Sequence, residues 1–349
     1  MSGPEQVRIT PEEADVRLDR WLRRRHPHVP QGLVERLCRK GEIRVDGGRV
    51  RPATRLEAGQ TVRLPPIPEP RDTPAAAAPQ PAVSEADAAM IRACVIWRDE
   101  DVLALNKPPG LAVQGGSGQR RHVDGLAEAL RFGAEEKPRL VHRLDRDTSG
   151  VLLMARSARA AAGLTRAFRD RTARKTYWAV VAGLPSPRAG TIRYGLVKAP
   201  GHGTGGEGEK MLCIAPADIA RTEGAKRATT DYRVIEAAAQ RASWVALRPV
   251  TGRTHQLRAH MAAIGHPVVG DGKYGTNAQE NTGTGWGAQL GGGVSRKLHL
   301  HARSLDLIHP RTGALLSLTA PLPEHMARTW ALFGWLPEDA PADPFGEAA

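Results

Sequence analysis

The sequence has few cysteines and no long apolar run, and each shortage excludes a class of protein. Its 349 residues include three cysteines, Cys38, Cys94 and Cys213, and none of them forms a C-x-x-C pair. An odd number of widely spaced thiols argues against a disulfide framework or a structural zinc site, and it fits a reducing compartment. The chain also lacks the run of about 18 apolar residues that a membrane span needs, so we expect no membrane partner.

Targeting signals and aromatic residues are also scarce. Residues 1–11 show no basic start followed by an apolar core, so we expect no secretory signal and a cytoplasmic location. Aromatic residues make up only 4% of the chain. This does not fit the aromatic platforms of a glycosidase, and no second acid is placed to complete its carboxylate pair.

Acidic residues are outnumbered by basic ones. The chain has 50 Lys and Arg against 37 Asp and Glu, which gives a formal net charge of +13. A surplus of this size favours a polyanionic partner, of which nucleic acid is the commonest. A generally Arg-rich proteome is the alternative explanation.

Proline divides the chain into two parts. Seven prolines lie between Pro65 and Pro81, together with an alanine run at 75–78, which predicts a semi-rigid linker over residues 65–87. We therefore expect a tail at 1–15, a small domain at 16–64, a large domain at 88–335 and a tail at 336–349.

The small domain is predicted to bind phosphates. Between Arg17 and Arg63 there are 13 basic and 5 acidic residues. Apolar residues at helical spacing predict helices around 18–24 and 33–40, followed by a hairpin at 43–50 and a strand at 61–64. Basic residues with few acidic partners lie on the outer faces of the two helices, where we expect RNA contacts: Arg20, Arg23, Arg24, Arg36, Arg39 and Lys40.

The large domain is predicted to be α+β, because its strands and helices lack regular βαβ alternation. Glycine-rich stretches at 201–208 and 283–293 are interpreted as loops or insertions. The predicted helices are 123–132, 158–171 and one that starts near 253–256 and carries Leu257, Met261 and Ile264 on its buried face. The predicted strands are 95–97, 102–105, 151–155, 176–181, 244–247, 305–308 and 315–318.

A dense polar cluster precedes the apolar strand at 151–155. Two acids and two arginines lie within residues 143–147, and holding them against a buried strand is costly unless they are paired or used. A loop at a strand end is a usual place for a catalytic carboxylate, so we select Asp145. Asp147 is more simply interpreted as the cap of a turn.

Two further clusters contain candidate residues. Arg258 lies among apolar neighbours and needs an anion, for which Asp145 is a candidate. His255 lacks an acidic neighbour in a zinc-binding pattern, so a structural or RNA-facing role is preferred to metal ligation. Tyr177 lies on a predicted strand, and its alternation by itself favours a core aromatic residue.

These clusters resemble known families. Residues 16–64 resemble the ribosomal-S-four-like (αL) RNA-binding domain, in Arg17-Leu18-Asp19-Arg20-Trp21-Leu22 and the hairpin from Gly41 to Gly47. Residues 90–325 resemble the RluA/RluC-type RNA pseudouridine synthases, and the RluC branch in particular. The matching strings are Asn106-Lys107-Pro108, residues 112–118, 142–150 (H-R-L-D-R-D-T-S-G), 175–180, 251–258 (T-G-R-T-H-Q-L-R) and 300–302.

The resemblance implies a fold, a reaction and residue roles. The fold would be α+β with a mixed, largely antiparallel central sheet, and the reaction would isomerise uridines of large-subunit (23S) ribosomal RNA without a cofactor, in a monomer. Asp145 matches the essential carboxylate, Arg258 its cationic partner, Tyr177 the base-stacking aromatic, and Arg143 a residue that fills the gap left by the flipped base. Lys107 and Arg253 would hold phosphates or loops. The alternatives are a transfer-RNA synthase and a non-catalytic assembly factor that binds RNA.

Overall fold

The computed structural model describes residues 4–67, 83–115, 121–199, 210–275 and 293–346. The chain forms two compact units, Met1–Ala82 and Val83–Ala349. The predicted glycine-rich loops and most of the predicted linker lie outside the described residues.

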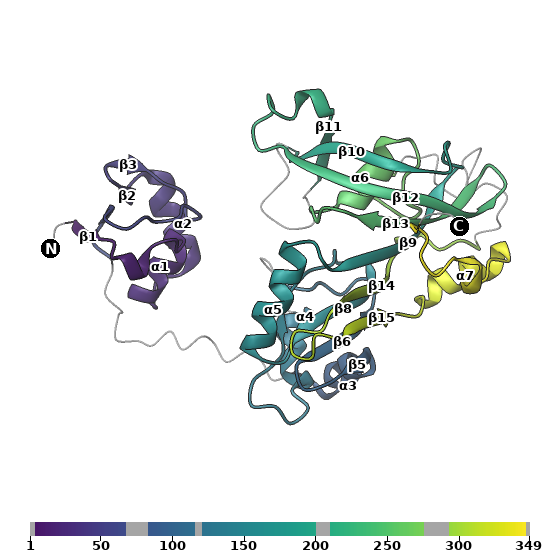
Figure 1. Ribbon diagram of the computed structural model, residues 1–349, viewed down its shortest axis with the longest axis horizontal. Helices are drawn as coiled ribbons and strands as arrows, with labels where there is room; N and C mark the ends of the chain where they lie inside the picture. Colours follow the sequence, from purple (N-terminus) through teal and green to yellow (C-terminus); the bar gives the residue numbers. More distant parts are fainter. Residues whose placement is uncertain (1–3, 68–82, 116–120, 200–209, 276–292, 347–349) are drawn as a thin grey trace. The chain divides into compact units, whose positions relative to one another are not determined.

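The N-terminal unit packs two helices against a small sheet (Figure 1). The helices are α1 (Leu18–Arg25) and α2 (Gln31–Lys40), and Gly41 in the left-handed conformation ends α2. Gly41 is the C-cap that the sequence predicts, because glycine adopts positive φ without steric cost. The sheet has the order β1-β4-β2-β3, with strands β1 (Glu5–Arg8), β2 (Arg44–Val45), β3 (Gly48–Arg49) and β4 (Thr61–Leu64).

The N-terminal unit begins earlier than the sequence predicts. Residues 1–15, predicted as a tail, include β1, which pairs antiparallel with β4, and a 3-10 turn at Pro11–Glu13. Val7 and Ile9 are buried in the core of this unit. The prediction of a tail was therefore wrong, because β1 carries too few apolar residues to be recognised as a strand.

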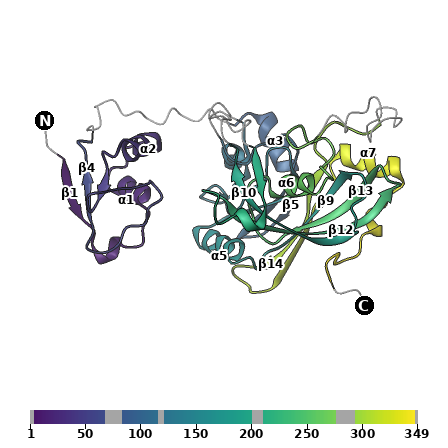
Figure 2. The ribbon, with the colours of Figure 1, turned by 90° about the horizontal axis from the view of Figure 1, so that it is seen from above.

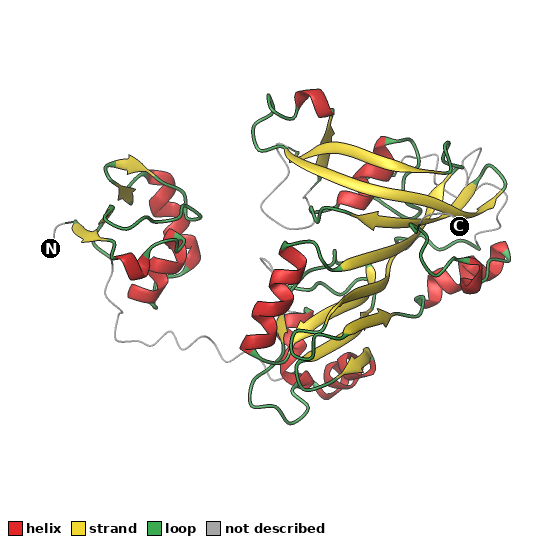
Figure 3. Ribbon diagram, in the orientation of Figure 1, coloured by secondary structure: helices red, strands yellow, loops and turns green. Residues whose placement is uncertain are grey.

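The C-terminal unit is built on one large twisted sheet with helices on both faces (Figures 2 and 3). Its order is β11-β10-β12-β13-β9-β14-β8-β6-β5, with β15 added beside β14 and β7 beside β8. The pairing of β14 with β8 is parallel, whereas the other pairings of this sheet are antiparallel. The predicted α+β class with a mixed, largely antiparallel sheet is confirmed.

The strands of this sheet have the following bounds. They are β5 (Val95–Arg98), β6 (Val102–Lys107), β7 (Arg139–Leu140), β8 (Ser149–Ala155), β9 (Arg174–Ala182), β10 (Ala189–Lys198), β11 (Met211–Ile214), β12 (Lys226–Ala238), β13 (Ala242–Pro249), β14 (Leu300–Ile308) and β15 (Leu315–Thr319). The sequence did not predict β7, β10, β11 or β12.

The helices of this unit are short, and α6 is buried along most of its length. They are α3 (Glu85–Ala93), α4 (Val123–Leu126), α5 (Ala158–Arg169), α6 (Gln256–Ala263) and α7 (Glu324–Phe333), with 3-10 turns at Ala127–Leu130, Pro216–Asp218 and Pro337–Asp339. The predicted helix at 123–132 is thus a short α-helix that tightens into a 3-10 turn.

Alternation along the strands decides which helix covers which face. On one face, Ala179 and Val181 of β9 pack with α6, and Leu152 and Met154 of β8 pack with α3 and α4. On the other face, Trp178 and Val180 pack with α7, and Val151 and Leu153 with α5. Tyr177 contacts both the α6 core and the α3–α4 core, so it lies where the two halves of one face meet.

The C-terminal residues also belong to this unit. Phe345 packs against the core that contains α7 and lies under the Arg248 guanidinium, 4.5 Å from ring centroid to Cζ. Asp343 forms an ion pair of 2.8 Å with Arg174. The prediction of a tail at 336–349 was therefore wrong as far as residue 346. Among the described residues, no helix is long and apolar enough to cross a membrane.

Candidate active site

The loop at 142–148 carries Asp145 to the point where β8 enters the sheet. At Gly150, φ is +108°, and a Cβ atom there would lie 2.2 Å from the Ala302 carbonyl oxygen of β14. Only glycine allows β14 to approach so closely. Thr148 N–H donates to the Asp145 carbonyl oxygen at 3.2 Å, which closes the loop into a turn. The Asp145 side chain is 26% exposed, so it is sheltered yet accessible.

The buried side chain of Lys107 ties this loop to the segment that follows β6. Its side chain is fully buried, and its ammonium donates hydrogen bonds to the carbonyl oxygens of Pro108, Leu111 and Arg146 at 2.8–2.9 Å. Burial disfavours the ammonium and lowers the pKa of Lys107 to about 7, against the opposing effects of Asp147 and Asp145. The prediction that Lys107 contacts RNA is therefore corrected. It holds loops, which was the alternative.

Helix α6 is fixed at its start by a buried glutamine. The Gln256 side-chain oxygen accepts hydrogen bonds from Thr251 Oγ1 at 2.7 Å and Arg253 N–H at 3.1 Å. Its amide donates to the Thr229 carbonyl oxygen of β12 at 2.8 Å. These bonds tie the first turn of α6 to the sheet, and this turn carries His255 and Arg258 toward the Asp145 loop.

Of the three predicted catalytic residues, Asp145 and Arg258 lie within ion-pair distance of each other, and the charge of Asp145 acts on Tyr177. The Nη1 atom of Arg258 lies 3.5 Å from Asp145 Oδ2, and His255 Nε2 lies 3.9 Å from the same oxygen. Burial and, to a smaller extent, the negative charge of Asp145 raise the pKa of Tyr177, so its phenol stays protonated at neutral pH. Burial lowers the pKa of His255, although Asp145 opposes this effect.

Sequence reasoning missed the closest partner of Arg258. The Nε and Nη2 atoms of Arg258 donate to the two carboxylate oxygens of Asp271 at 2.7 Å each. Burial alone would raise the pKa of Asp271, but the bonds from Arg258 and from two backbone amides outweigh it and hold that pKa below its usual value. Asp145, named from the sequence as the anion for Arg258, is thus its second and more distant partner. In the sequence, the string 270–275, which begins and ends with glycine, was the signal that could have pointed to Asp271.

The predicted RNA contacts on the surface are placed as follows. Arg143 is exposed, and within the described part of the chain no side chain pairs with it. Arg253 is exposed and donates from Nε to the Arg227 carbonyl oxygen at 3.3 Å. Their contact with RNA stays a prediction. The same holds for the six cations of the N-terminal unit, which are all exposed: Arg20, Arg23, Arg24, Arg36, Arg39 and Lys40.

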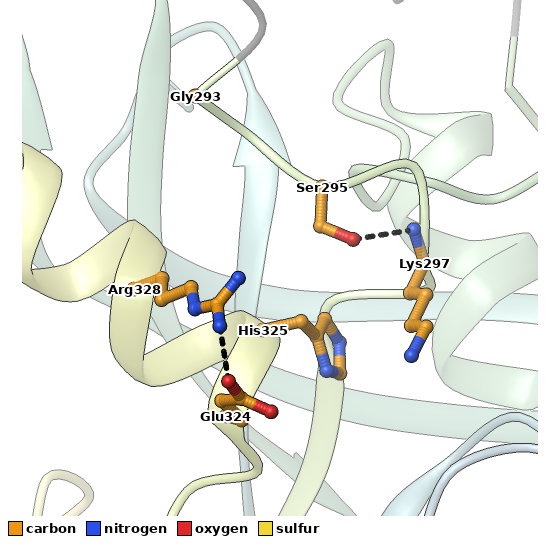
Figure 4. A pocket seen from close by; sticks show the side chains of 6 residues that line it. All are labelled: Gly293, Ser295, Lys297, Glu324, His325 and Arg328. Carbon is orange, nitrogen blue, oxygen red and sulfur yellow. Dashed lines mark hydrogen bonds and ion pairs between the residues drawn. The ribbon is translucent and has the colours of Figure 1, made fainter.

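A separate hollow lies beside α7 (Figure 4). It has a volume of about 400 Å³, and none of the predicted catalytic residues lines it. Glu324 and Arg328 form an ion pair on its wall, and His325 Nε2 bonds to the Leu298 carbonyl oxygen. Because these groups are already paired, the hollow offers no chemistry comparable with the cluster around Asp145.

The cluster around Asp145 is suited to reactions of a carboxylate. Arg258 places a positive charge 3.5 Å from the Asp145 carboxylate, and the charge of Asp145 acts on the buried, protonated phenol of Tyr177. Such a carboxylate serves as a nucleophile or as a base. No group of three or more metal-binding side chains occurs in the described ranges.

Comparison with known protein families identifies both units. Residues 101–263 match the family model described as RNA pseudouridylate synthase, and residues 16–62 match the S4 domain. The catalytic-family match includes Asp145, Tyr177 and Arg258.

Individual proteins are similar over most of the chain. A ribosomal large subunit pseudouridine synthase C of Escherichia coli K12 is 37% identical over 324 residues, which cover 92% of this chain and 94% of that protein. Its counterpart in Vibrio cholerae is 35% identical over 320 residues, with the same coverage. Among solved structures, human RNA pseudouridylate synthase domain containing 4 is 29% identical with a TM-score of 0.57, and the match covers 71% of this chain and 95% of that one.

Proposed function

The chain belongs to the RNA pseudouridylate synthases, and from this premise we propose that it isomerises specific uridines of large-subunit ribosomal RNA. Pseudouridine formation breaks the N1–C1′ bond of uridine, turns the uracil, and forms a C5–C1′ bond; the C5 proton is released to solvent, and N1 takes up a proton in its place. The isomerisation balances without an oxidant, a reductant or an energy source. The proposal also includes that side chains alone carry the reaction, and that the protein is a cytoplasmic monomer.

The single observation that carries the proposal is the position of Asp145. Its carboxylate lies 3.5 Å from the Arg258 guanidinium, and its charge acts on the buried phenol of Tyr177. A stacked base cannot reach such a group, so the target uridine must be flipped out of its helix. We propose that Tyr177 then stacks on the uracil and that the exposed Arg143 fills the vacated space, because guanidinium planes stack well on bases.

Asp145 would act on the ribose of the flipped nucleotide. Attack of one of its oxygens on the sugar and removal of a sugar proton both require the ionised carboxylate. Arg258 supplies the nearby positive charge that favours this form. Arg258 thereby stabilises the reactive state of Asp145 without itself contacting the bond that breaks.

The choice of large-subunit ribosomal RNA rests on two supports. The similar proteins of Escherichia coli and Vibrio cholerae carry that substrate in their names. The N-terminal S4 domain presents exposed arginines on both of its helices, as a surface that follows a phosphate backbone would.

The test of the catalytic assignment replaces Asp145. We expect Asp145→Asn and Asp145→Ala to fold and to bind RNA, but to release no tritium from RNA labelled at C5 of uridine. Asp147→Asn is the matched control, because Asp147 lies two residues away in the same loop and pairs with Arg146. Tritium release by the Asp145 variants at the wild-type rate would refute the assignment.

The test of the substrate maps pseudouridine in a strain that lacks the gene. Loss of sites in large-subunit ribosomal RNA, restored by the wild-type gene but not by Asp145→Asn, is the expected result. Loss confined to transfer RNA would make the protein a transfer-RNA synthase. Full rescue by Asp145→Asn would instead indicate a non-catalytic role in assembly.

A further inference from the structure

A half-buried lysine without an anionic partner lies close to the proposed active site. Lys175 is the second residue of β9, the strand between β13 and β14 (Figure 1). Within the described residues, no carboxylate pairs with its ammonium and no oxygen accepts a hydrogen bond from it. A charge that is partly withdrawn from water is costly unless an anion compensates it. The position of this ammonium therefore calls for a partner that the protein itself does not supply.

The surroundings of Lys175 are neutral or positively charged. A Cβ atom at Gly252 would lie 4.0 Å from Lys175 Nζ, so the ammonium lies beside bare backbone there. The imidazole of His142 accepts a hydrogen bond from Leu153 N–H at 2.8 Å. Burial and, to a smaller extent, the charge of Lys175 lower the pKa of His142 to about 3, so this ring is neutral. Burial and the charge of Arg171 lower the pKa of Lys175 itself.

The neighbours of Lys175 belong to two segments that form the proposed active site. His142 lies in the loop that carries Asp145, and Gly252 lies in the turn that leads into α6. Tyr177 follows Lys175 after two residues of β9, which corresponds to about 7 Å along a strand. One nucleotide spans a distance of this order. A uridine stacked on Tyr177 therefore brings a backbone phosphate within reach of Lys175.

Three exposed arginines border the same place. Arg143 follows His142, Arg253 follows Gly252, and Arg171 lies two residues beyond the end of α5. In the part of the chain that the structure describes, none of the three pairs with a carboxylate. Cations gathered around a half-buried ammonium without an acid create a positive potential, which favours a bound anion. The phosphodiester groups of RNA are anions of this kind.

We propose that Lys175 binds a backbone phosphodiester next to the flipped uridine, so that one strand holds both the base and the backbone of the target nucleotide. The proposal rests on the proposed function, since the anion arrives only with the RNA substrate. The ammonium is already partly dehydrated, so its attraction to a phosphate is stronger than that of a cation at the open surface. The exposed arginines attract RNA from a distance, whereas Lys175 fixes where its backbone lies.

The test is a thermodynamic cycle between the side chain and the phosphate. A short RNA with a mapped target uridine is prepared with a neutral methylphosphonate in place of the phosphodiester on the 5′ or the 3′ side of that uridine. All proteins are full-length and carry Asp145→Asn, so that filter binding is measured without turnover. We expect one of the two replacements to raise the dissociation constant about tenfold, as loss of one charge-assisted hydrogen bond would.

The variant Lys175→Met removes the charge and keeps most of the side-chain stem. It should raise the dissociation constant for the natural RNA by a similar factor and lose nothing further with that methylphosphonate. It should also lower the slope of log K against log salt by about 0.7. Additive losses at both methylphosphonate positions, or an unchanged salt slope, overturn the inference.

A structural role for Lys175 is distinguished by the stability of the free protein. Because Lys175→Met removes a charge without a partner, the melting temperature in the absence of RNA should stay the same or rise. A fall in the melting temperature would mean that the ammonium already has a stabilising partner within the protein, and it would overturn the inference.

The matched control is the preceding residue of the same strand. Arg174 forms an ion pair of 2.8 Å with Asp343, and successive residues of a strand point to opposite sides. Arg174→Met removes the same charge one residue away, and its effect should be additive with either methylphosphonate. Protein with the native Asp145 is assayed on the same RNA in parallel. If it releases no tritium, the proposed function fails, whereas release together with an additive cycle for Lys175→Met refutes the inference alone.

Discussion

The side chains around Asp145 come from separate parts of the chain, and buried polar groups hold the Asp145 loop, the start of α6 and Arg258 in place. Lys107 fixes the loop, Gln256 fixes the start of α6, and Asp271 fixes the Arg258 fork. Buried polar groups are stable only when their hydrogen bonds are made, so this network has few alternative arrangements. The proposed catalytic carboxylate is therefore placed by its surroundings rather than by its own bonds.

His260 on α6 is a contrasting residue, because neither ring nitrogen has a hydrogen-bond partner in the described structure. It is fully buried, and burial lowers its pKa from 6.5 to about 4. Below pH 6.5, the His260 side chain becomes protonated in the unfolded chain. In the native state it stays neutral until the pH reaches about 4. Acid therefore destabilises the native state through His260, by about 2 kcal/mol at pH 5.

We predict that His260→Leu reduces this acid sensitivity. The variant loses no hydrogen bond that the described structure contains, and it removes the proton-linked cost, so the fall in unfolding free energy between pH 7 and pH 5 should be smaller than in the wild type. Chemical denaturation at both pH values measures it. An equal fall in the variant and in the wild type would contradict the prediction.

Among the strands, the approach of β14 to β8 has the strictest steric requirement. The parallel register pairs Ala302 with Gly150, and the missing side chain at 150 allows it. The Asp145 loop ends one residue before β8 begins at Ser149. Any change that separates the two strands therefore displaces the loop as well.

Gly150→Ala is predicted to destabilise the catalytic unit and to abolish activity. Its Cβ meets backbone atoms of Ala302 at 2.2–2.7 Å, in addition to the strain of positive φ, so the loss should exceed about 2 kcal/mol. Gly313→Ala is the control, because Gly313 has φ of +71° but no neighbouring atom lies within 4 Å of the place that an alanine Cβ would take. Urea unfolding of the two variants distinguishes steric conflict from φ strain alone. Equal losses of unfolding free energy in both variants would show that the contact between β14 and β8 does not add to the cost.

How much the sequence predicts depends on how strongly each segment is patterned. The continuous apolar run at 151–155 and the helix spacing at 158–171 were interpreted correctly, because they bury whole faces, although the helix ends at Arg169. Strand β12 buries Ala228, Thr230, Tyr232 and Val234 at alternate positions, but only the last two are large apolar residues, and β10 contains two glycines. Asp271 was missed because its partner lies 13 residues away across an irregular turn, where no periodicity links them.

In the molecule as a whole, basic charge is concentrated in the N-terminal unit. Residues 17–63 hold 13 basic against 5 acidic residues, although they are a small part of the chain. The proposed chemistry is confined to the other unit. Affinity for RNA and catalysis are therefore expected to be separable properties.

Deletion of residues 1–82 is predicted to weaken RNA binding and to flatten its salt dependence. Each phosphate contact that is lost lowers the slope of log K against log salt by about 0.7–0.9. Filter binding at several KCl concentrations measures the slope, and tritium release at saturating RNA should persist. Full-length protein with Arg20, Arg24 and Arg36 changed to Gln tests the charges alone. An unchanged slope in both proteins would contradict the assignment of these cations.

The position of β14 has a consequence for synthesis of the protein. This strand, residues 300–308, is inserted between β8 and β9, which were made about 120–150 residues earlier. Because the middle of the sheet stays open until that late segment leaves the ribosome, a nascent chain cannot complete its catalytic unit during most of translation. Prematurely terminated products thus bear an intact S4 domain without a working enzyme, and they would compete with the finished protein for its RNA.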